Sequence, residues 1–239
     1  MEQATDATVI GHRPVPLVGR RDELHALMSA LQARQSRLVA GPAGIGKTRL
    51  LSEAASRSAV PYILVRGPRV LHDLLSQLAA RLPCRPAGVT SSALKSAVLE
   101  SLRYAPRAVF LEDIAHADPR MYRFLQAVYH SPGSFLIVTA RSRDSLGYLR
   151  RLLWDPREEL ALQPLKRAEA ACLFDAAAAR YKLDSLDLDG FRRNVLRAAH
   201  GNPGQILAMC RLAARPDYRQ GQRIRFLPLW MDVLPAFVR

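Results

Sequence analysis

Apolar residues follow two different periods along the first two thirds of the chain. Apolar runs of buried-strand length lie at residues 37–40, 62–66, 108–111 and 134–139, with a weaker one at 159–162. Between them, residues 71–82, 92–104 and 120–129 repeat apolar positions at helical spacing. Strands that alternate with helices pack most economically as a parallel sheet with helices on its faces. The pattern therefore predicts an α/β fold, a three-layer core around a parallel sheet of about five strands.

The two ends of this core have different patterns. Residues 1–14 are polar and without apolar period, so we expect a flexible N-terminal arm. Next, Leu24, Leu27, Met28 and Leu31 predict a helix before the first strand, with Asp22 as its N-cap.

Beyond Pro164 only helical periods occur, over residues 167–180, 188–200 and 204–214. Gly201-Asn202-Pro203 separates the last two, with Gly201 suited to a helix C-terminus and Pro203 to the next first turn. We therefore expect an arm at 1–14, a core at 15–165, a small all-helical lid at 166–214 and a tail at 215–239.

One motif carries specific chemistry. Residues 41–48, GPAGIGKT, match GxxxxGK[ST] at every fixed position and lie between a predicted strand and a predicted helix. Glycines let the backbone N–H groups surround a phosphate, and the helix N-terminus adds its positive dipole end. Lys47 is then expected to reach the β and γ phosphates of ATP, and the Thr48 hydroxyl to bind Mg²⁺. The alternative is a glycine-rich turn without ligand.

Two acids follow the strand predicted at residues 108–111. Neighbouring residues of a strand point to opposite faces, so Glu112 and Asp113 cannot do the same work. We assign Glu112 to the Mg²⁺ shell, through water, and Asp113 to positioning or deprotonating the attacking water. The alternative is a pair of acids that caps the next helix.

Together these motifs resemble the AAA+ ATPases. LVGR at 17–20, the 41–48 loop, FLEDIAHAD at 110–118, FLIVTAR at 135–141 and GNP at 201–203 recur in this order in that class. They are most similar to the STAND signalling ATPases and the origin-recognition type. The resemblance implies a P-loop NTPase core that binds ATP and Mg²⁺ beneath a helical lid.

The resemblance also implies roles for single residues. Val18 and Gly19 would border the adenine pocket, Thr139 would sense the γ phosphate, and Arg141 would lie close to the site. The candidates for binding the nucleotide are Val18, Gly19, Gly41, Pro42, Ala43, Gly44, Ile45, Gly46, Lys47, Thr48, Arg49 and Pro203.

The order of the two acids departs from the pattern of many AAA+ ATPases, which have Asp before Glu. Here Glu112 precedes Asp113, so the shorter carboxylate stands where the base is expected. A shift of about one ångström impairs catalytic geometry, so we expect slow turnover. Arg120 and Arg123 are candidates for an arginine finger that acts on a neighbouring subunit.

Charge and composition indicate which classes of binding partner and which compartment to expect. Thirty-five Lys and Arg against 21 Asp and Glu give a net charge of +14, which attracts polyanions, nucleic acid first. An arginine-rich genome would give the same count. Three dispersed cysteines and the lack of a signal peptide or an 18-residue apolar stretch predict a cytoplasmic protein with reduced thiols.

The tail leaves several possibilities open. Its last 17 residues, RIRFLPLWMDVLPAFVR, could dock a protein partner, swap between subunits, anchor to a membrane surface or pack on the chain's own core. Two functions follow: a self-assembling AAA+ switch that associates with DNA and recruits a protein, or a STAND-like scaffold whose target is protein. A metabolic kinase is a distant third.

Overall fold

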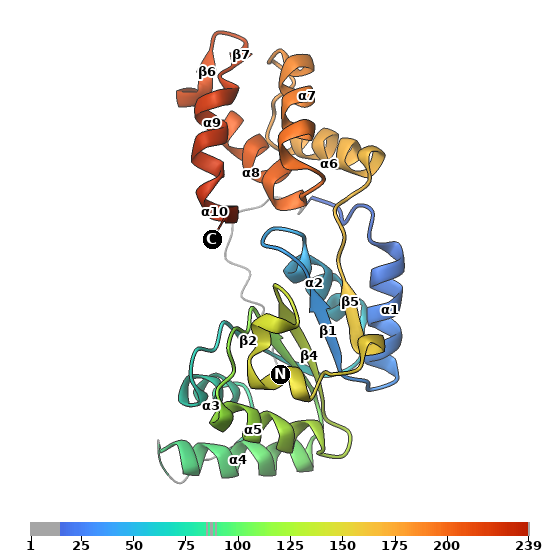
Figure 1. Ribbon diagram of the computed structural model, residues 1–239, viewed down its shortest axis with the longest axis vertical. Helices are drawn as coiled ribbons and strands as arrows, with labels where there is room; N and C mark the ends of the chain where they lie inside the picture. The colour runs from blue at the N-terminus through green and yellow to red at the C-terminus, as the bar shows by residue number, and fades with distance from the viewer. Residues whose placement is uncertain (1–14, 85, 87, 89, 239) are drawn as a thin grey trace.

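The core is a three-layer α/β unit around one parallel sheet. The computed structural model describes residues 15–84, 86, 88 and 90–238, so the predicted arm at 1–14 lies outside the described residues. The five strands of the sheet stand in the order β2-β3-β4-β1-β5 (Figure 1). They are β1 (Arg37–Ala40), β2 (Tyr62–Arg66), β3 (Ala108–Glu112), β4 (Phe135–Ala140) and β5 (Glu159–Ala161).

Helices cover both faces of the sheet, which explains the continuous apolar runs of its central strands. Every residue of β3 and β4 is buried. Alternate residues of β3 serve opposite faces: Phe110 packs with α1 (Arg21–Gln32) and α2 (Lys47–Arg57), whereas Val109 and Leu111 pack with the helices of the other face. Those helices are α3 (Leu71–Ala79), α4 (Ser91–Tyr104) and α5 (Pro119–Tyr129). The predicted α/β class and five-strand parallel sheet are confirmed.

The first helix begins earlier than predicted. Arg20 is its N-cap residue, and Asp22 lies inside the first turn, so the prediction of Asp22 as N-cap is wrong. The Arg20 side chain donates to the backbone carbonyls of Ile45 and Gln163, and these bonds hold the chain in place at the start of the helix. Asp22 still complements the positive end of the helix dipole.

The lid has a hydrophobic core of its own. Its helices are α6 (Arg167–Arg180), α7 (Leu188–Ala199) and α8 (Pro203–Ala213), and they lie above the end of the core where the chain passes from β1 into α2 in Figure 1. His200 ends α7 in the left-handed conformation and Gly201 follows it with positive φ, while Pro203 occupies the first turn of α8. The break predicted at residues 201–203 is thus confirmed.

The C-terminal segment, residues 215–238, packs on the lid. It forms a small hairpin, β6 (Arg219–Gln220) and β7 (Arg223–Ile224), and then α9 (Phe226–Val233) and α10 (Pro235–Val238). Leu229 is fully buried and Val233 is 3% exposed, both within the hydrophobic core of the lid. Of the possibilities left open for the tail, packing on the chain's own fold is the one seen.

Short 3-10 turns complete the connections, at Asp144–Leu146, Tyr148–Arg151, Pro156–Glu158 and Pro216–Tyr218. The last of these begins at Pro216, which cannot continue a helix, shortly after α8 ends at Ala213. In the described part of the chain, no helix combines the length and apolar character that crossing a bilayer requires.

Candidate functional site

A cavity of about 980 Å³ lies between the core and the lid. Its walls come from the segment before α1, the 41–48 loop, the ends of β3 and β4, and the lid helices α6 and α8. The volume is at the upper end of the range for small-molecule sites. The carboxyl ends of parallel strands are where α/β folds bind ligands, and this cavity lies there.

The 41–48 loop makes the tight turn that its glycines predict. Gly44 and Gly46 have φ of +77° and +103°, a region that other residues rarely adopt. The turn delivers the chain into α2, which begins at Lys47. The first N–H groups of a helix have no partner within it, so the start of α2 adds donors at the cavity.

Lys47 folds back over the loop. Its side-chain nitrogen donates to the carbonyl oxygens of Gly41 at 2.7 Å and Pro42 at 3.1 Å. Burial lowers the pKa of Lys47, while the nearby charges of Asp113 and Arg141 respectively raise and lower it. Lys47, Asp113 and Arg141 thus bring three charged side chains together at this end of the cavity.

Asp113 lines the cavity and has a left-handed backbone conformation. It follows β3 with φ of +49°, and its N–H donates to the Thr139 hydroxyl oxygen at 2.9 Å. Asp113 lines the cavity together with Lys47, Thr48 and Arg141. Thr139 is fully buried on β4 and lies outside the lining. In this structure the Thr139 hydroxyl holds the Asp113 backbone from outside the lining, and its role as a γ-phosphate sensor stays a prediction.

Glu112 is placed differently from our expectation. It is buried, lies outside the cavity lining, and its carboxylate pairs with the Arg66 guanidinium at 3.3 Å. The reason is the sheet register: Arg66 on β2 is directly opposite Glu112 on β3, so the two side chains share one side of the sheet. Glu112 is thus held beside Arg66, behind the cavity lining, and its role in the Mg²⁺ shell through water stays a prediction.

The other predicted residues divide into two groups. Those that line the cavity are Val18, Ala43, Gly44, Ile45, Gly46, Arg49 and Pro203. Those outside the lining are Gly19, Gly41, Pro42, Gly201 and Asn202, of which Gly19 packs against Glu169 of the lid. Arg120 and Arg123 are exposed on α5 and lie outside the lining, and their role as arginine fingers stays a prediction.

The residues that close the cavity from the lid were not predicted from the sequence. Leu173, Arg180, Tyr181 and Leu207 line it from α6, the end of α6 and α8. The helical period could only place these residues on helices, because it does not show which part of a lid helix faces the core. Arg20 was also missed as a site residue, although it stands beside Gly19 in the LVGR motif.

No protein-family model matches the chain, and no curated protein sequence matches it. Solved structures do. Aeropyrum pernix Orc1, determined in complex with DNA, has 19% identity and a TM-score of 0.61 over 93% of this chain and 66% of that one. Cdc6p from Pyrobaculum aerophilum has 15% identity and a TM-score of 0.66 over 86% and 64%.

A third similar structure comes from the signalling ATPases. It is a STAND protein with a tetratricopeptide repeat sensor from Pyrococcus horikoshii, with 20% identity and a TM-score of 0.55 over 94% of this chain and 33% of that one. The chain thus spans slightly less than two thirds of the first two proteins and one third of the third. These likenesses confirm the expected fold, that of the AAA+ P-loop ATPases.

Proposed function

We propose that this chain binds and slowly hydrolyses ATP, and that nucleotide occupancy switches its assembly with copies of itself. The observation that carries the proposal is the GxxxxGK[ST] loop between β1 and α2, at the mouth of a cavity that also contains Asp113 and Arg141. Backbone amides, a helix N-terminus and a lysine at one point form a phosphate site.

The lining of the cavity favours one orientation for ATP. The 41–48 loop would hold the triphosphate, and Lys47, which donates to the carbonyls of Gly41 and Pro42 here, would donate to phosphate oxygens instead. The adenine would lie toward the part of the wall formed by Val18, Leu173, Tyr181 and Leu207. Pro203 at the start of α8 brings the lid over the nucleotide.

Mg²⁺ fits the oxygen donors at the phosphate end. Thr48 is exposed and lines the cavity, and a hydroxyl oxygen is a ligand that this ion takes alongside phosphates, with Glu112 as the acid predicted for its shell through water. The ion would neutralise phosphate charge during transfer to water. The positioning of the attacking water stays assigned to Asp113, which lines the cavity. A single short carboxylate is consistent with slow turnover.

We further propose DNA as the target of the switch. The net charge of +14 and the likeness to an Orc1 determined with DNA support this choice. The likeness to the STAND protein favours a second candidate, a scaffold whose target is another protein. Recruitment of a protein partner through the C-terminal segment rests on its exposed Leu227 and Met231.

Removal of the Lys47 ammonium tests the nucleotide site. We expect Lys47→Ala to weaken binding of a fluorescent ATP analogue by about 10- to 100-fold, because charged hydrogen bonds each contribute about 1.5–3 kcal/mol. ATP-dependent assembly measured by sedimentation should disappear in the same variant. Lys95→Ala, on the exposed face of α4, is the matched control and should bind as the wild type does. Wild-type affinity in Lys47→Ala would refute the site.

A further inference from the structure

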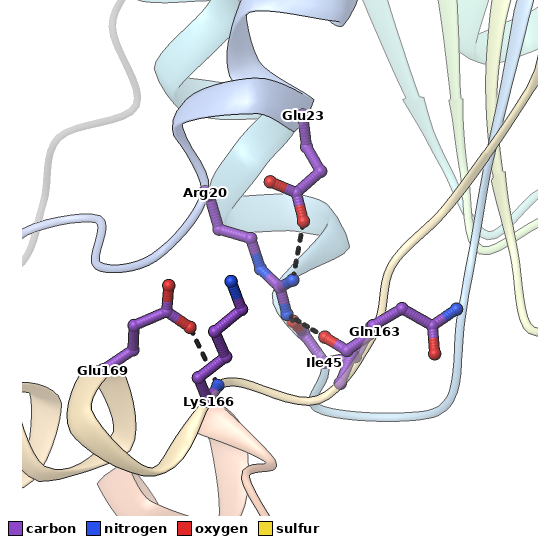
Figure 2. Close-up of polar contacts among 6 residues, drawn as sticks. All are labelled: Arg20, Glu23, Ile45, Gln163, Lys166 and Glu169. Atoms are coloured by element: carbon purple, nitrogen blue, oxygen red, sulfur yellow. Dashed lines mark hydrogen bonds and ion pairs between the residues drawn. The ribbon is translucent and has the colours of Figure 1, made fainter.

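Arg20 is a buried cation at the meeting point of three segments. Only 5% of the residue is exposed, although it is charged. One terminal nitrogen donates to the carbonyl oxygens of Ile45 at 3.2 Å and Gln163 at 2.6 Å. The other pairs with Glu23 at 2.9 Å (Figure 2). Arg20 therefore joins the 41–48 loop to the linker between β5 and the lid.

The lid itself contacts the same loop. The Asn202 side-chain amide donates to the carbonyl of Ala43 at 2.9 Å, and the Gly204 N–H donates to the carbonyl of Gly44 at 2.8 Å. With the bond from Arg20, three successive loop carbonyls, at residues 43, 44 and 45, accept hydrogen bonds from the lid or from Arg20. These contacts determine how the loop's peptide groups are turned.

A trans peptide group is planar, and its C=O and N–H point in opposite directions. The carbonyls of residues 43 and 44 point toward the lid, and that of Ile45 points toward Arg20. The N–H groups of the residues that follow them therefore point to the other side of the loop. Ile45 N–H donates to the Pro42 carbonyl at 3.3 Å, within the loop. The peptides whose direction matters for a ligand are consequently those of Gly44 and Gly46, and Arg20 holds the second.

The chemistry of arginine suits this position. A guanidinium is a planar fork of donors that can serve several acceptors at once, whereas a lysine ammonium is a point charge. The linker that Arg20 contacts is tied to the lid, since Leu165 N–H donates to the Gly201 carbonyl at 2.9 Å. Lid, linker and loop are thus connected through hydrogen bonds to backbone carbonyls.

We propose that Arg20 is a positioning residue for phosphate binding: by joining the Ile45 carbonyl to the Gln163 carbonyl, it keeps the loop amides aligned while the lid is docked. The inference rests on the proposed function, in which this loop takes the phosphates of a nucleotide. A preorganised loop binds more tightly because it does not have to be ordered by the ligand. Loss of Arg20 should therefore weaken the binding of phosphate groups and leave the binding of adenine unchanged.

The test is isothermal titration calorimetry of the full chain with ADP and with adenosine. In Arg20→Gln we expect ADP affinity to fall by about tenfold, as for the loss of a charged hydrogen bond, and adenosine affinity to stay at the wild-type value. Arg20→Lys should give a smaller loss for ADP. Arg57→Gln is the matched control, since Arg57 also pairs with a glutamate of its own helix but is 56% exposed.

The outcomes separate the inference from the function. Wild-type protein that binds neither ADP nor ATP would refute the proposed function. Wild-type protein that binds ADP, with Arg20→Gln binding it equally well, would overturn the role of Arg20. An equal loss for ADP and adenosine would also overturn it, because a general structural effect predicts that result. If Arg20→Gln does not fold, Arg20→Lys decides: unchanged ADP affinity in that variant refutes the inference.

Discussion

At the scale of single residues, two neighbouring acids have entirely different surroundings. Glu112 ends β3 with its carboxylate buried against Arg66, whereas Asp113 leaves the strand with a positive φ and lines the cavity. The hydroxyl of Thr139 accepts the Asp113 N–H and so maintains the turn. A strained backbone held by a buried neighbour is often found at functional sites.

Asp113 is the residue whose change should separate binding from chemistry. We expect Asp113→Asn to keep ATP affinity within about threefold of wild type and to lower the hydrolysis rate by at least about 100-fold, the scale of one general base. Phosphate release under single-turnover conditions measures this step. Asp144→Asn is the control, because the Asp144 side chain is 93% exposed. An unchanged rate in Asp113→Asn would remove that residue from the mechanism.

At the scale of elements, α9 belongs to the lid although its sequence allowed a free tail. Leu229 is fully buried with the lid helices, and Leu227, two residues earlier, is 69% exposed. The face of α9 that carries Leu229 therefore completes the hydrophobic core of the lid. The face that carries Leu227 is exposed and available to a partner.

The two leucines provide a matched pair. Leu229→Ala should lower the free energy of unfolding by about 2–5 kcal/mol, the usual result of truncating a buried leucine. Leu227→Ala should change it by no more than about 0.5 kcal/mol, as exposed substitutions do. Chemical denaturation followed by circular dichroism measures both. Equal stability of the two variants would mean that α9 does not pack on the lid in solution.

At the scale of the whole molecule, charge determines which partners are favoured. A net charge of +14 gives the chain a positive field that concentrates polyanions near its surface. The field says nothing about sequence preference, since contacts with phosphates do not read bases. Nucleotide-dependent assembly would multiply these contacts along one DNA molecule.

Salt titration distinguishes the two proposed targets. With ATP present, we expect the logarithm of duplex DNA affinity to fall linearly with the logarithm of salt concentration, because bound cations are released. Fluorescence anisotropy with a labelled duplex provides the measurement, and Lys47→Ala with ATP is the control that should bind DNA less well. Assembly with ATP but no salt-dependent DNA binding would favour the protein-directed scaffold.

The sequence by itself determined the features that depend on short stretches of chain. Strand and helix periods located the elements of the sheet and lid, and the GxxxxGK[ST] spacing identified the loop where β1 enters α2. Glycine and proline at 201–203 located the helix break. Each of these follows from neighbours within about ten residues, so local pattern was enough.

Only the tertiary structure decided which side chains meet. The bond from Arg20 to Gln163 joins residues 143 positions apart, and the bond from Asn202 to Ala43 spans 159 positions. Sheet register turned Glu112 toward Arg66, and the packing of the lid decided that Leu229 is inside. Such contacts depend on how whole elements dock, and a period of two or 3.6 residues gives only the face a residue occupies, not what that face touches.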